Sequence, residues 1–353
     1  MLAMRGALAT LAVVVDVAVQ CCLVMPFRNE ASSLAPVLDS LAQQDVDWSR
    51  FRFIGVDSAS RDASGALVQA WLGRHGIRGE VVRVDRPGIP RALNAGIARV
   101  ERGEAVVRLD AHTTYAPGYL RTLLHALDEL GEDVWWVGGP QHPAPLNGAG
   151  FGHALVRALM TNRMGLGGAA WRHAKTPRPV DSVYLGVFRP GVLERVGGFD
   201  DAWEANEDAE LAARIRAAGG RIWYVPARCD YHITRVPVAT LRQWSRYGFW
   251  RAHTMLRHPS TVRPRHLAPP LALLVAVTLA LSPARAALLP LGAAFAALVV
   301  RSRERDERIA VTLATLLYFP CTHLAFAGGM AAGAVAATLK RLRGPAKVRR
   351  APG

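Results

Sequence analysis

The chain has 353 residues, half of them apolar and a fifth charged, which suits one large catalytic domain with an appendage and excludes a disordered protein. Its 43 Lys and Arg against 28 Asp and Glu give a formal charge of +15. This charge indicates either an anionic partner or a general preference for Arg in the composition. The four cysteines have neither zinc-cage nor disulfide-framework spacing, and fit a reducing compartment.

The first 14 residues form an N-terminal extension in this interpretation. The apolar run Ala7–Val15 resembles a short signal peptide, but Asp16 and Gln20 interrupt it. A buried strand over Val17–Met25 explains the pattern better, so we expect the folded domain to begin near residue 15.

Short apolar runs then alternate with amphipathic stretches. We expect strands at Val17–Met25, Phe51–Val56, Glu80–Val84 and Ala105–Leu109, and helices at Ser33–Gln43, Ala63–Arg74 and Arg91–Arg102. This alternation predicts an α/β fold with a mostly parallel sheet flanked by helices. Ligands of such sheets bind outside the carboxyl ends of the strands.

Residues 136–265 are richer in Gly, Pro and Trp. We expect a loop over Gly138–Gly152, a helix near Asp208–Ala218 that stops at Gly219-Gly220, and a short strand over Arg221–Val225. No internal repeat is visible.

Residues 267–339 have almost no polar face and indicate membrane-associated helices, with a soluble helical bundle as the alternative. Leu267–Leu281 and Ala286–Val300 are each about 15 residues long, whereas a straight span needs about 20. The longer stretch Ile309–Leu339 is interrupted by Pro320 and by Gly328-Gly329, and a basic tail, 340–353, follows it.

Basic clusters precede the first apolar stretch, follow the second and follow the third. Because basic residues favour the cytoplasmic side, this pattern favours helical hairpins or re-entrant elements over a single span. We therefore expect a cell-membrane protein whose catalytic domain faces the cytoplasm.

Three carboxylates follow predicted strands. Glu30, Asp57 and Asp110 should meet at one sheet edge, where carboxylates tolerate a diphosphate only with a metal between them. Asp110 and His112 are two residues apart in extended chain and would face one Mn²⁺ or Mg²⁺. The alternative is a turn-forming Asp beside a surface His. Arg91 would add a phosphate contact.

Two further patterns allow two interpretations each. Glu207-Asp208 opens a helix, where acidic residues are favoured by the helix dipole alone, but a carboxylate there is also a candidate general base. Gln243-Trp244-Ser245-Arg246-Tyr247 precedes the first apolar stretch, and is either an interfacial aromatic belt or a platform for sugar and phosphate. The chain has no Gly-x-Gly-x-x-Gly after its first strand and no Walker loop, which counts against nicotinamide enzymes and P-loop kinases.

In their order and spacing, these motifs resemble the family-2 inverting glycosyltransferases of GT-A fold, and within them the succinoglycan-synthesis glucosyltransferase type, over about residues 17–250. Pro26 to Glu30 is similar to the family's Pro-x-x-Asn-Glu, and Asp57 begins a segment similar to its Asp-Asp-Gly-Ser, with Ser58 and Ala59 departing from the pattern. Asp110-Ala111-His112 falls on the Asp-x-Asp metal motif, with His in place of the second carboxylate.

The resemblance implies a residue for each role. Asp208 would be the catalytic base, and Asp110 and His112 the ligands of Mn²⁺ or Mg²⁺. Donor-binding residues would be Pro26, Phe27, Glu30, Asp57, Arg91 and Asp110, and acceptor-binding residues Glu207, Gln243, Trp244 and Arg246.

The domain division implied is a nucleotide-sugar-binding half at 15–112 and an acceptor half at 113–250, followed by a juxtamembrane linker at 251–266. The Gln-x-x-Arg-Trp pattern of processive synthases ends in Trp, but Tyr247 occupies that position here. This difference favours transfer of one sugar per acceptor.

The expected activity is metal-dependent, inverting transfer from a nucleotide-sugar, with a UDP-sugar favoured, to a lipid-linked saccharide in exopolysaccharide or cell-envelope glycan synthesis. Two alternatives stay open: transfer to a polyprenyl phosphate itself, or a non-enzymatic basic protein of the membrane surface. Nucleic acid is not an expected partner of the enzyme.

Overall fold

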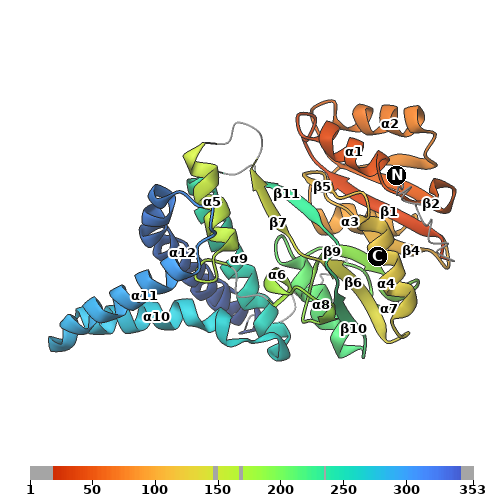
Figure 1. Ribbon diagram of the computed structural model, residues 1–353. Helices are drawn as coiled ribbons and strands as arrows, with labels where there is room; N and C mark the ends of the chain where they lie inside the picture. Colours follow the sequence, from red (N-terminus) through yellow and green to blue (C-terminus); the bar gives the residue numbers. More distant parts are fainter. Residues whose placement is uncertain (1–18, 146–149, 167–169, 234–235, 343–353) are drawn as a thin grey trace, which may run out of the picture.

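The computed structural model describes residues 19–145, 150–166, 170–233 and 236–342 (Figure 1). The N-terminal extension and most of the basic tail lie outside these residues. The central feature is an eight-stranded sheet of order β3-β2-β1-β4-β9-β6-β10-β8. Its strands are β1 Cys21–Phe27, β2 Phe51–Ser58, β3 Gly79–Val84, β4 Ala105–Arg108, β6 Val134–Gly139, β8 Arg178–Pro179, β9 Tyr184–Phe188 and β10 Arg221–Tyr224.

The sheet is mixed but mostly parallel. β1 pairs in parallel with β2 and β4, β2 with β3, and β6 with β10. β9 runs antiparallel between β4 and β6, and β8 runs antiparallel to β10. The carboxyl ends of β1, β2 and β4 therefore meet at one edge, as expected for the candidate carboxylates.

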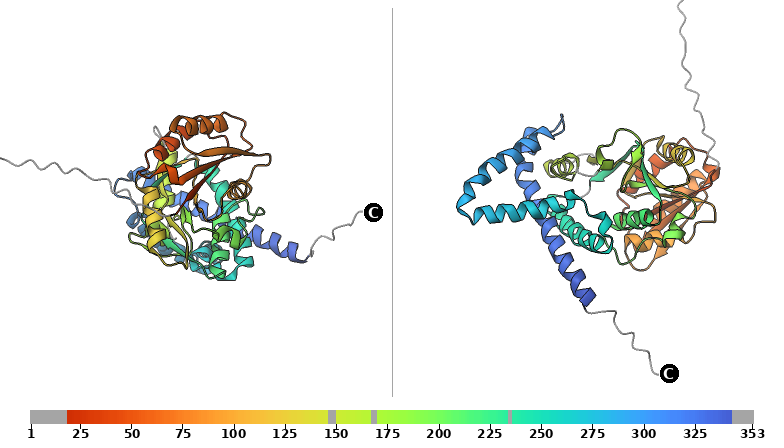
Figure 2. Two further views of the ribbon diagram at one scale, coloured as in Figure 1. Left: turned by 90° about the vertical axis from the view of Figure 1, so that its right-hand side faces the viewer. Right: turned by 90° about the horizontal axis from the view of Figure 1, so that it is seen from below.

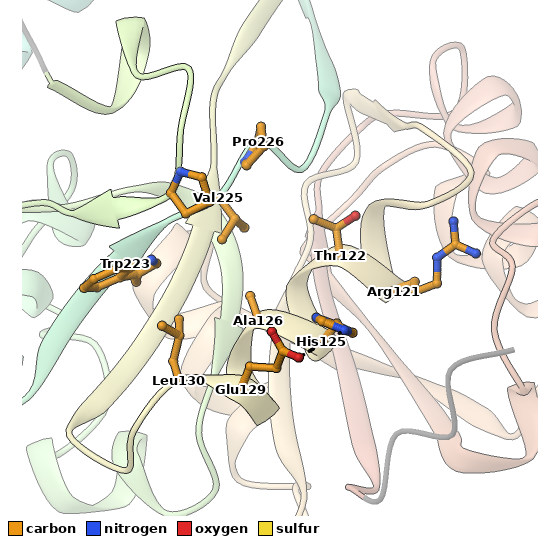
Figure 3. A pocket seen from close by; sticks show the side chains of 10 residues that line it. Arg121, Thr122, His125, Ala126, Glu129, Leu130, Trp223, Val225 and Pro226 are labelled. Carbon is orange, nitrogen blue, oxygen red and sulfur yellow. Dashed lines mark ion pairs between the residues drawn. The ribbon is translucent and has the colours of Figure 1, made fainter. Parts of the chain in front are cut away.

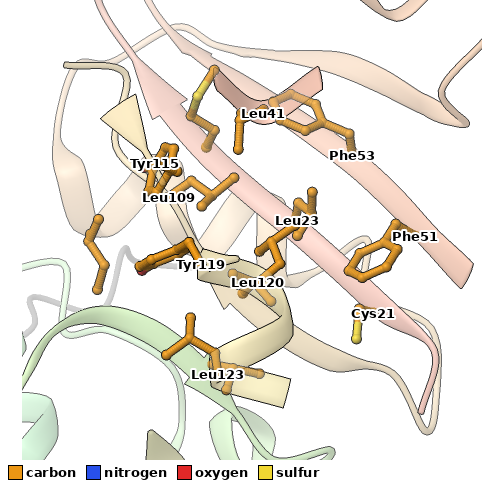
Figure 4. Close-up of a cluster of buried hydrophobic side chains, with 14 of the residues drawn as sticks. Cys21, Leu23, Leu41, Phe51, Phe53, Leu109, Tyr115, Tyr119, Leu120 and Leu123 are labelled. Atoms are coloured by element: carbon orange, nitrogen blue, oxygen red, sulfur yellow. The ribbon is translucent and has the colours of Figure 1, made fainter. Parts of the chain in front are cut away.

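Helices cover both faces of this sheet. They are α1 Leu34–Ala42, α2 Ser64–His75, α3 Ile89–Ile97, α4 Tyr119–Glu129, α7 Val192–Val196 and α8 Glu207–Ala217, with a 3₁₀ turn at Trp48–Arg50. Alternate residues of β1 face opposite layers. Leu23 belongs to a buried cluster with residues of α1, α2 and α4, and Figure 4 shows it near Leu120 of α4. Val24 belongs to a second buried cluster, with residues of α3 and α8. A strand buried on both faces reads as a continuous apolar run, which is why the sequence shows it clearly.

The segment expected to be a loop over Gly138–Gly152 contains regular secondary structure. β6 continues to Gly139, β7 occupies His142–Pro145, and helix α5 (Phe151–Thr161) begins before the predicted loop ends. β7 belongs to a second, three-stranded sheet of order β5-β11-β7, with β5 at Thr113–Tyr115 and β11 at Cys229–Ile233. Its partner β11 is distant in sequence, so a local Gly and Pro pattern gave no sign of the pairing.

The C-terminal part is helical. It comprises α9 Pro237–Arg257, α10 Pro264–Ala280, α11 Leu288–Arg301 and α12 Ile309–Leu342, with 3₁₀ turns at Pro259–Thr261 and Pro283–Ala287, and a short helix α6 (Ala170–His173) precedes it. α10 and α11 form a hairpin that projects from the body (Figure 2). Pro283–Arg301 and Ile309–Leu342 are long and apolar enough to cross a membrane.

α12 packs along α9 and is continuous, so the expected interruption at Pro320 and Gly328-Gly329 is wrong. Glycines explain the close approach of the two helices. A Cβ on Gly329 would overlap the backbone of Ser245, one on Gly333 that of Phe249, and one on Gly248 that of Phe326. Gly329 is therefore a contact residue rather than a helix breaker.

Candidate active site

The loops that follow β1 and β2 are hydrogen-bonded to each other. The backbone amide of Asn29 donates to Ser60 Oγ at 3.1 Å, and that of Glu30 to Ser64 Oγ at 2.8 Å. Asn29 and Ala59 both have positive φ, at 55° and 57°. Ala59 stands where the resembled family has Gly, and the left-handed backbone supplies the physical reason for that preference. The two loops thereby fix Glu30 beside the ends of both strands.

Asp57 lies at the end of β2, 5% exposed, with both carboxyl oxygens engaged. Oδ1 accepts from the Ser60 amide at 2.7 Å, and Oδ2 accepts from Arg83 at 2.6 Å. Of the two neighbouring donor-site candidates on β1, Pro26 is half-buried, whereas Phe27 is 3% exposed and packs in the core. The Phe27 side chain is thus directed away from a ligand at this edge, because an apolar ring gains more from the core than from solvent.

Asp110, His112 and Glu30 come together at the end of β4. His112 Nε2 is 3.9 Å from Asp110 Oδ2, and His112 Nδ1 is 3.7 Å from Glu30 Oε1. Tyr184 donates to Asp110 Oδ2 at 2.9 Å, and the His112 ring stands edge-on to Tyr231 at 5.1 Å. The sequence analysis did not identify Tyr184 as a site residue. It immediately precedes Leu185, whose φ of 49° is the kind of backbone strain that gathers at functional sites.

The residues present fit a shared divalent cation rather than a closed protein cage. No group of three His, Cys, Asp or Glu side chains gathers closely enough to hold a metal within the described ranges. Asp110 and His112 supply one carboxylate oxygen and one imidazole nitrogen, a donor set that suits Mn²⁺. A cation held by two protein ligands keeps its other positions for phosphate oxygens and water, which is how such ions bind nucleotides.

Arg108 joins this cluster to the start of α8. It is 5% exposed, pairs with Glu207 Oε1 at 3.1 Å and with Asp208 Oδ1, and lies over the Phe199 ring. Burial lowers the pKa of Arg108, but Asp208, Glu207 and Asp110 outweigh it and raise that pKa. A charged residue inside the apolar run of β4 was the available signal, since a buried Arg must be paired.

The carboxyl of Asp208 is 30% exposed, and its Oδ2 has no hydrogen-bond partner among the described residues. Burial raises its pKa to about 7, against the opposing charge of Arg108 and with the help of Glu207 and Asp110. A carboxylate with one oxygen held and the other available, and with a pKa near neutrality, has the properties of a general base.

α9 brings part of the predicted acceptor motif toward this centre. Gln243, Trp244 and Tyr247 line a pocket of about 80 Å³ together with Tyr231 and Arg172. Gln243 donates to the Tyr247 hydroxyl at 2.7 Å. Arg246 is exposed and lies outside the pocket lining, because it occupies another face of the helix.

Arg172 was missed by the sequence interpretation. Its guanidinium donates to Gln141 at 3.0 Å and lies 4.4 Å from the Trp171 ring, with no carboxylate paired to it in the ranges that the structure describes. Burial lowers its pKa to about 10.

Arg91 and Asn94, both on α3, face the segment that leads to Asp208. Arg91 Nε is 3.8 Å from Asp201 Oδ2, and Asn94 donates to the Phe199 carbonyl at 2.7 Å and accepts from its amide at 2.9 Å. Asn94 thus anchors the turn before Glu207, a role that the sequence did not reveal.

A second cavity lies away from these residues. It has a volume of about 440 Å³ and lies between α4 and the end of β10, where Trp223 and Val225 face His125 and Leu130 (Figure 3). None of the predicted site residues lines it.

Comparison with known proteins identifies the class. The family model of Glycosyl transferase family 2 matches residues 22–197. The succinoglycan biosynthesis protein ExoA of Rhizobium meliloti is 26% identical over 253 residues, which cover 70% of this chain and 73% of that protein. The dodecaprenyl-phosphate galacturonate synthase of Rhizobium johnstonii is 30% identical over 118 residues, covering 32% of this chain and 35% of that protein.

Among solved structures, the mannosyltransferase PcManGT from Pyrobaculum calidifontis, in complex with GDP-Man and Mn²⁺, superposes with a TM-score of 0.56 at 23% identity over 86% of each chain. This likeness shows the fold, and the expected GT-A architecture is confirmed. Residues 22–197 are a glycosyl transferase family 2 domain, and the resemblance to the succinoglycan-synthesis type is confirmed as well.

Proposed function

We propose that this glycosyltransferase transfers a sugar, with inversion, from a nucleotide-sugar to a hydroxyl of a lipid-linked saccharide at the cytoplasmic face of the cell membrane. The observation that carries the proposal is the proximity of two groups of side chains. Glu30, Asp110 and His112 lie at the sheet edge, and Arg108 connects that edge to Asp208. The first group suits a donor diphosphate with its cation, and Asp208 suits an acceptor hydroxyl.

Asp208 would accept the proton of the acceptor hydroxyl on Oδ2 as that oxygen attacks the anomeric carbon from the side opposite the diphosphate. Arg108 holds the carboxylate in place and is itself held by Glu207. Asp57 is proposed to contact the base of the donor. A divalent cation bound by Asp110 and His112, Mn²⁺ or Mg²⁺, would offset the charge that develops on the leaving diphosphate. Mn²⁺ accompanies GDP-Man in the solved mannosyltransferase, which supports this expectation.

A lipid-linked acceptor is supported by the apolar C-terminal helices and by the names of the relatives. One relative is a succinoglycan biosynthesis protein, which favours exopolysaccharide assembly, and another is a dodecaprenyl-phosphate sugar synthase. We propose that α10 and α11 enter the membrane as a hairpin, and that the catalytic domain lies on the cytoplasmic side.

The relation to the dodecaprenyl-phosphate synthase favours a second candidate, in which the acceptor is a polyprenyl phosphate. A phosphate oxygen is already ionised and needs no base, so Asp208→Asn separates the two. Loss of transfer with donor binding retained supports a hydroxyl acceptor, whereas retained transfer to a polyprenyl phosphate supports the second candidate.

The test is nucleotide release by the detergent-solubilised full chain with UDP-, GDP- and dTDP-sugars, in Mn²⁺, Mg²⁺ or chelator. We expect metal-dependent release from one donor, lost in Asp110→Ala. Arg74→Gln, an exposed change on α2 far from the site, is the matched control. Absence of donor binding with every metal would overturn the proposal.

A further inference from the structure

An excess of arginine gathers where α9 and α10 meet the catalytic domain. Asp181, just before β9, is the carboxylate at its centre. Arg263 pairs with it at 2.8 Å, Arg216 at 3.4 Å and Arg265 at 3.9 Å. One carboxylate therefore faces three guanidinium groups.

Arg251 adds a fourth guanidinium, from α9. Its contact is a neutral one, the Asn206 side-chain oxygen at 3.2 Å. Burial, followed by the charge of Arg265, lowers the pKa of Arg251 to about 10. Arg251 is half-buried, and no carboxylate is paired with it among the residues that the structure describes. An anion from outside would offset the cost of holding this charge away from water.

His266 lies in the same cluster and is 9% exposed. Its Nδ1 is buried without a hydrogen-bond partner in the part of the chain that the structure describes. A buried imidazole nitrogen without a protein partner, beside this arginine cluster, supports a polar ligand at this place.

The surroundings point to a lipid as the source of that group. α10 begins at Pro264, within the cluster, and continues as an apolar helix with Leu271 and Leu274 more than half exposed. On the other side, Arg251 contacts Asn206, which precedes α8 and lies two positions before Asp208. A group bound here therefore has an apolar surface on one side and the proposed base on the other.

We propose that Arg251, Arg263, Arg265 and Arg216 bind the phosphate group of a membrane lipid. Guanidinium forks match phosphate oxygens in pairs, and four of them exceed what Asp181 neutralises. The inference rests on the membrane attachment proposed above. The phosphate has two possible sources: the diphosphate of a polyprenyl-linked acceptor, or the headgroup of a bilayer phospholipid.

The test is native mass spectrometry of the full chain in an uncharged detergent, with farnesyl diphosphate, phosphatidylglycerol or phosphatidylcholine added in separate titrations. We expect a phosphate-bearing anionic lipid to bind at least tenfold more tightly than zwitterionic phosphatidylcholine, and Arg251→Gln and Arg265→Gln each to weaken it by about tenfold. Arg74→Gln removes the same charge elsewhere and should leave binding unchanged.

Preference for farnesyl diphosphate assigns the site to the acceptor, and preference for phosphatidylglycerol assigns it to a bilayer lipid. Equal binding of all three lipids by the unmodified chain, a result that needs no variant, would overturn the proposal, as would full binding in both Gln variants. If Arg251→Gln does not fold, Arg251→Lys takes its place in the titration, because it keeps the positive charge but removes the guanidinium fork. Because nucleotide release is measured separately, release without lipid-phosphate binding would refute this inference and leave the proposed function standing.

Discussion

Arg108 is the residue on which the arrangement of the candidate site depends. Replacing it with Met leaves Glu207 buried without its partner, and breaking a buried pair in this way costs about 3–5 kcal/mol of unfolding free energy. We expect Arg108→Met to lower stability by that order in denaturant unfolding and to abolish transfer. The double variant Arg108→Met/Glu207→Gln should recover much of the stability but not the activity. A single variant as stable as the unmodified chain would contradict this account.

The pH dependence of transfer should follow Asp208. Its pKa is raised to about 7, so the carboxyl is protonated and inactive as a base below that pH. We expect the rate to rise with pH up to about 7, changing about tenfold per unit on the acid side. For folding the sign is opposite: because the folded pKa exceeds the unfolded value, the stability that this group contributes is present at low pH and is lost as pH rises through 7.

Rate measurements from pH 5 to 9 with saturating donor would check this, with Asp128→Asn, an exposed carboxylate change on α4, as the matched control. A profile flat across pH 7 would count against Asp208 as the base.

Some residues of the candidate site could be identified from the sequence, and others could not. Asp57, Asp110 and Glu30 end apolar strands, so their convergence at one edge follows from the topology of a parallel sheet. Tyr184 and Arg172 come from β9 and α6, whose spatial neighbours are distant in the chain. Such contacts depend on tertiary packing and leave no local pattern, which is why the sequence did not indicate them.

At the scale of elements, strands buried on both faces were predicted well because their apolar runs are continuous. β1 begins at Cys21 rather than Val17, and the third helix ends at Ile97 rather than Arg102. α9 was not predicted at all, although it has 21 residues. One side of it packs on α12 and another contacts the catalytic domain through Asn206 and Trp203. A helix that packs against two partners lacks a single apolar stripe, so the 3.6-residue hydrophobic period is not visible in its sequence.

The close contact between α9 and α12 should be sensitive to the size of the residue at position 329. Gly329→Ala places a methyl group against the Ser245 backbone, which forces the helices apart, whereas Gly328→Ala meets open space. We expect Gly329→Ala to lower thermal stability in detergent by several degrees, and Gly328→Ala to leave it unchanged or slightly higher because Ala favours helix. Equal melting temperatures for the two variants would show that the contact between Gly329 and the Ser245 backbone does not contribute to thermal stability.

The whole molecule combines a catalytic domain with apolar helices whose arrangement bears on topology. α12 packs on α5 and α9 through residues such as Phe319 and Gly329, while Leu313, Leu317 and Val335 on its other side are more than half exposed. A helix that packs on α9 over much of its length, and on α5 near its start, suits a place on the membrane surface better than a crossing. In that arrangement the basic clusters on both sides of α12 would lie on the same side of the membrane.

Cysteine labelling tests this topology in membrane vesicles of known orientation. In a Cys321→Ser background, which removes the half-buried native thiol, Ser302→Cys precedes α12 and Lys340→Cys lies in its last turn. We expect a membrane-impermeant maleimide to label both from the cytoplasmic side only, and Ser282→Cys, at the tip of the α10–α11 hairpin, to be protected by the bilayer. If Lys340→Cys were labelled from the opposite side to Ser302→Cys, α12 would be a true span. The basic end of the chain would then lie across the membrane from the catalytic domain, and the proposed surface arrangement would be wrong.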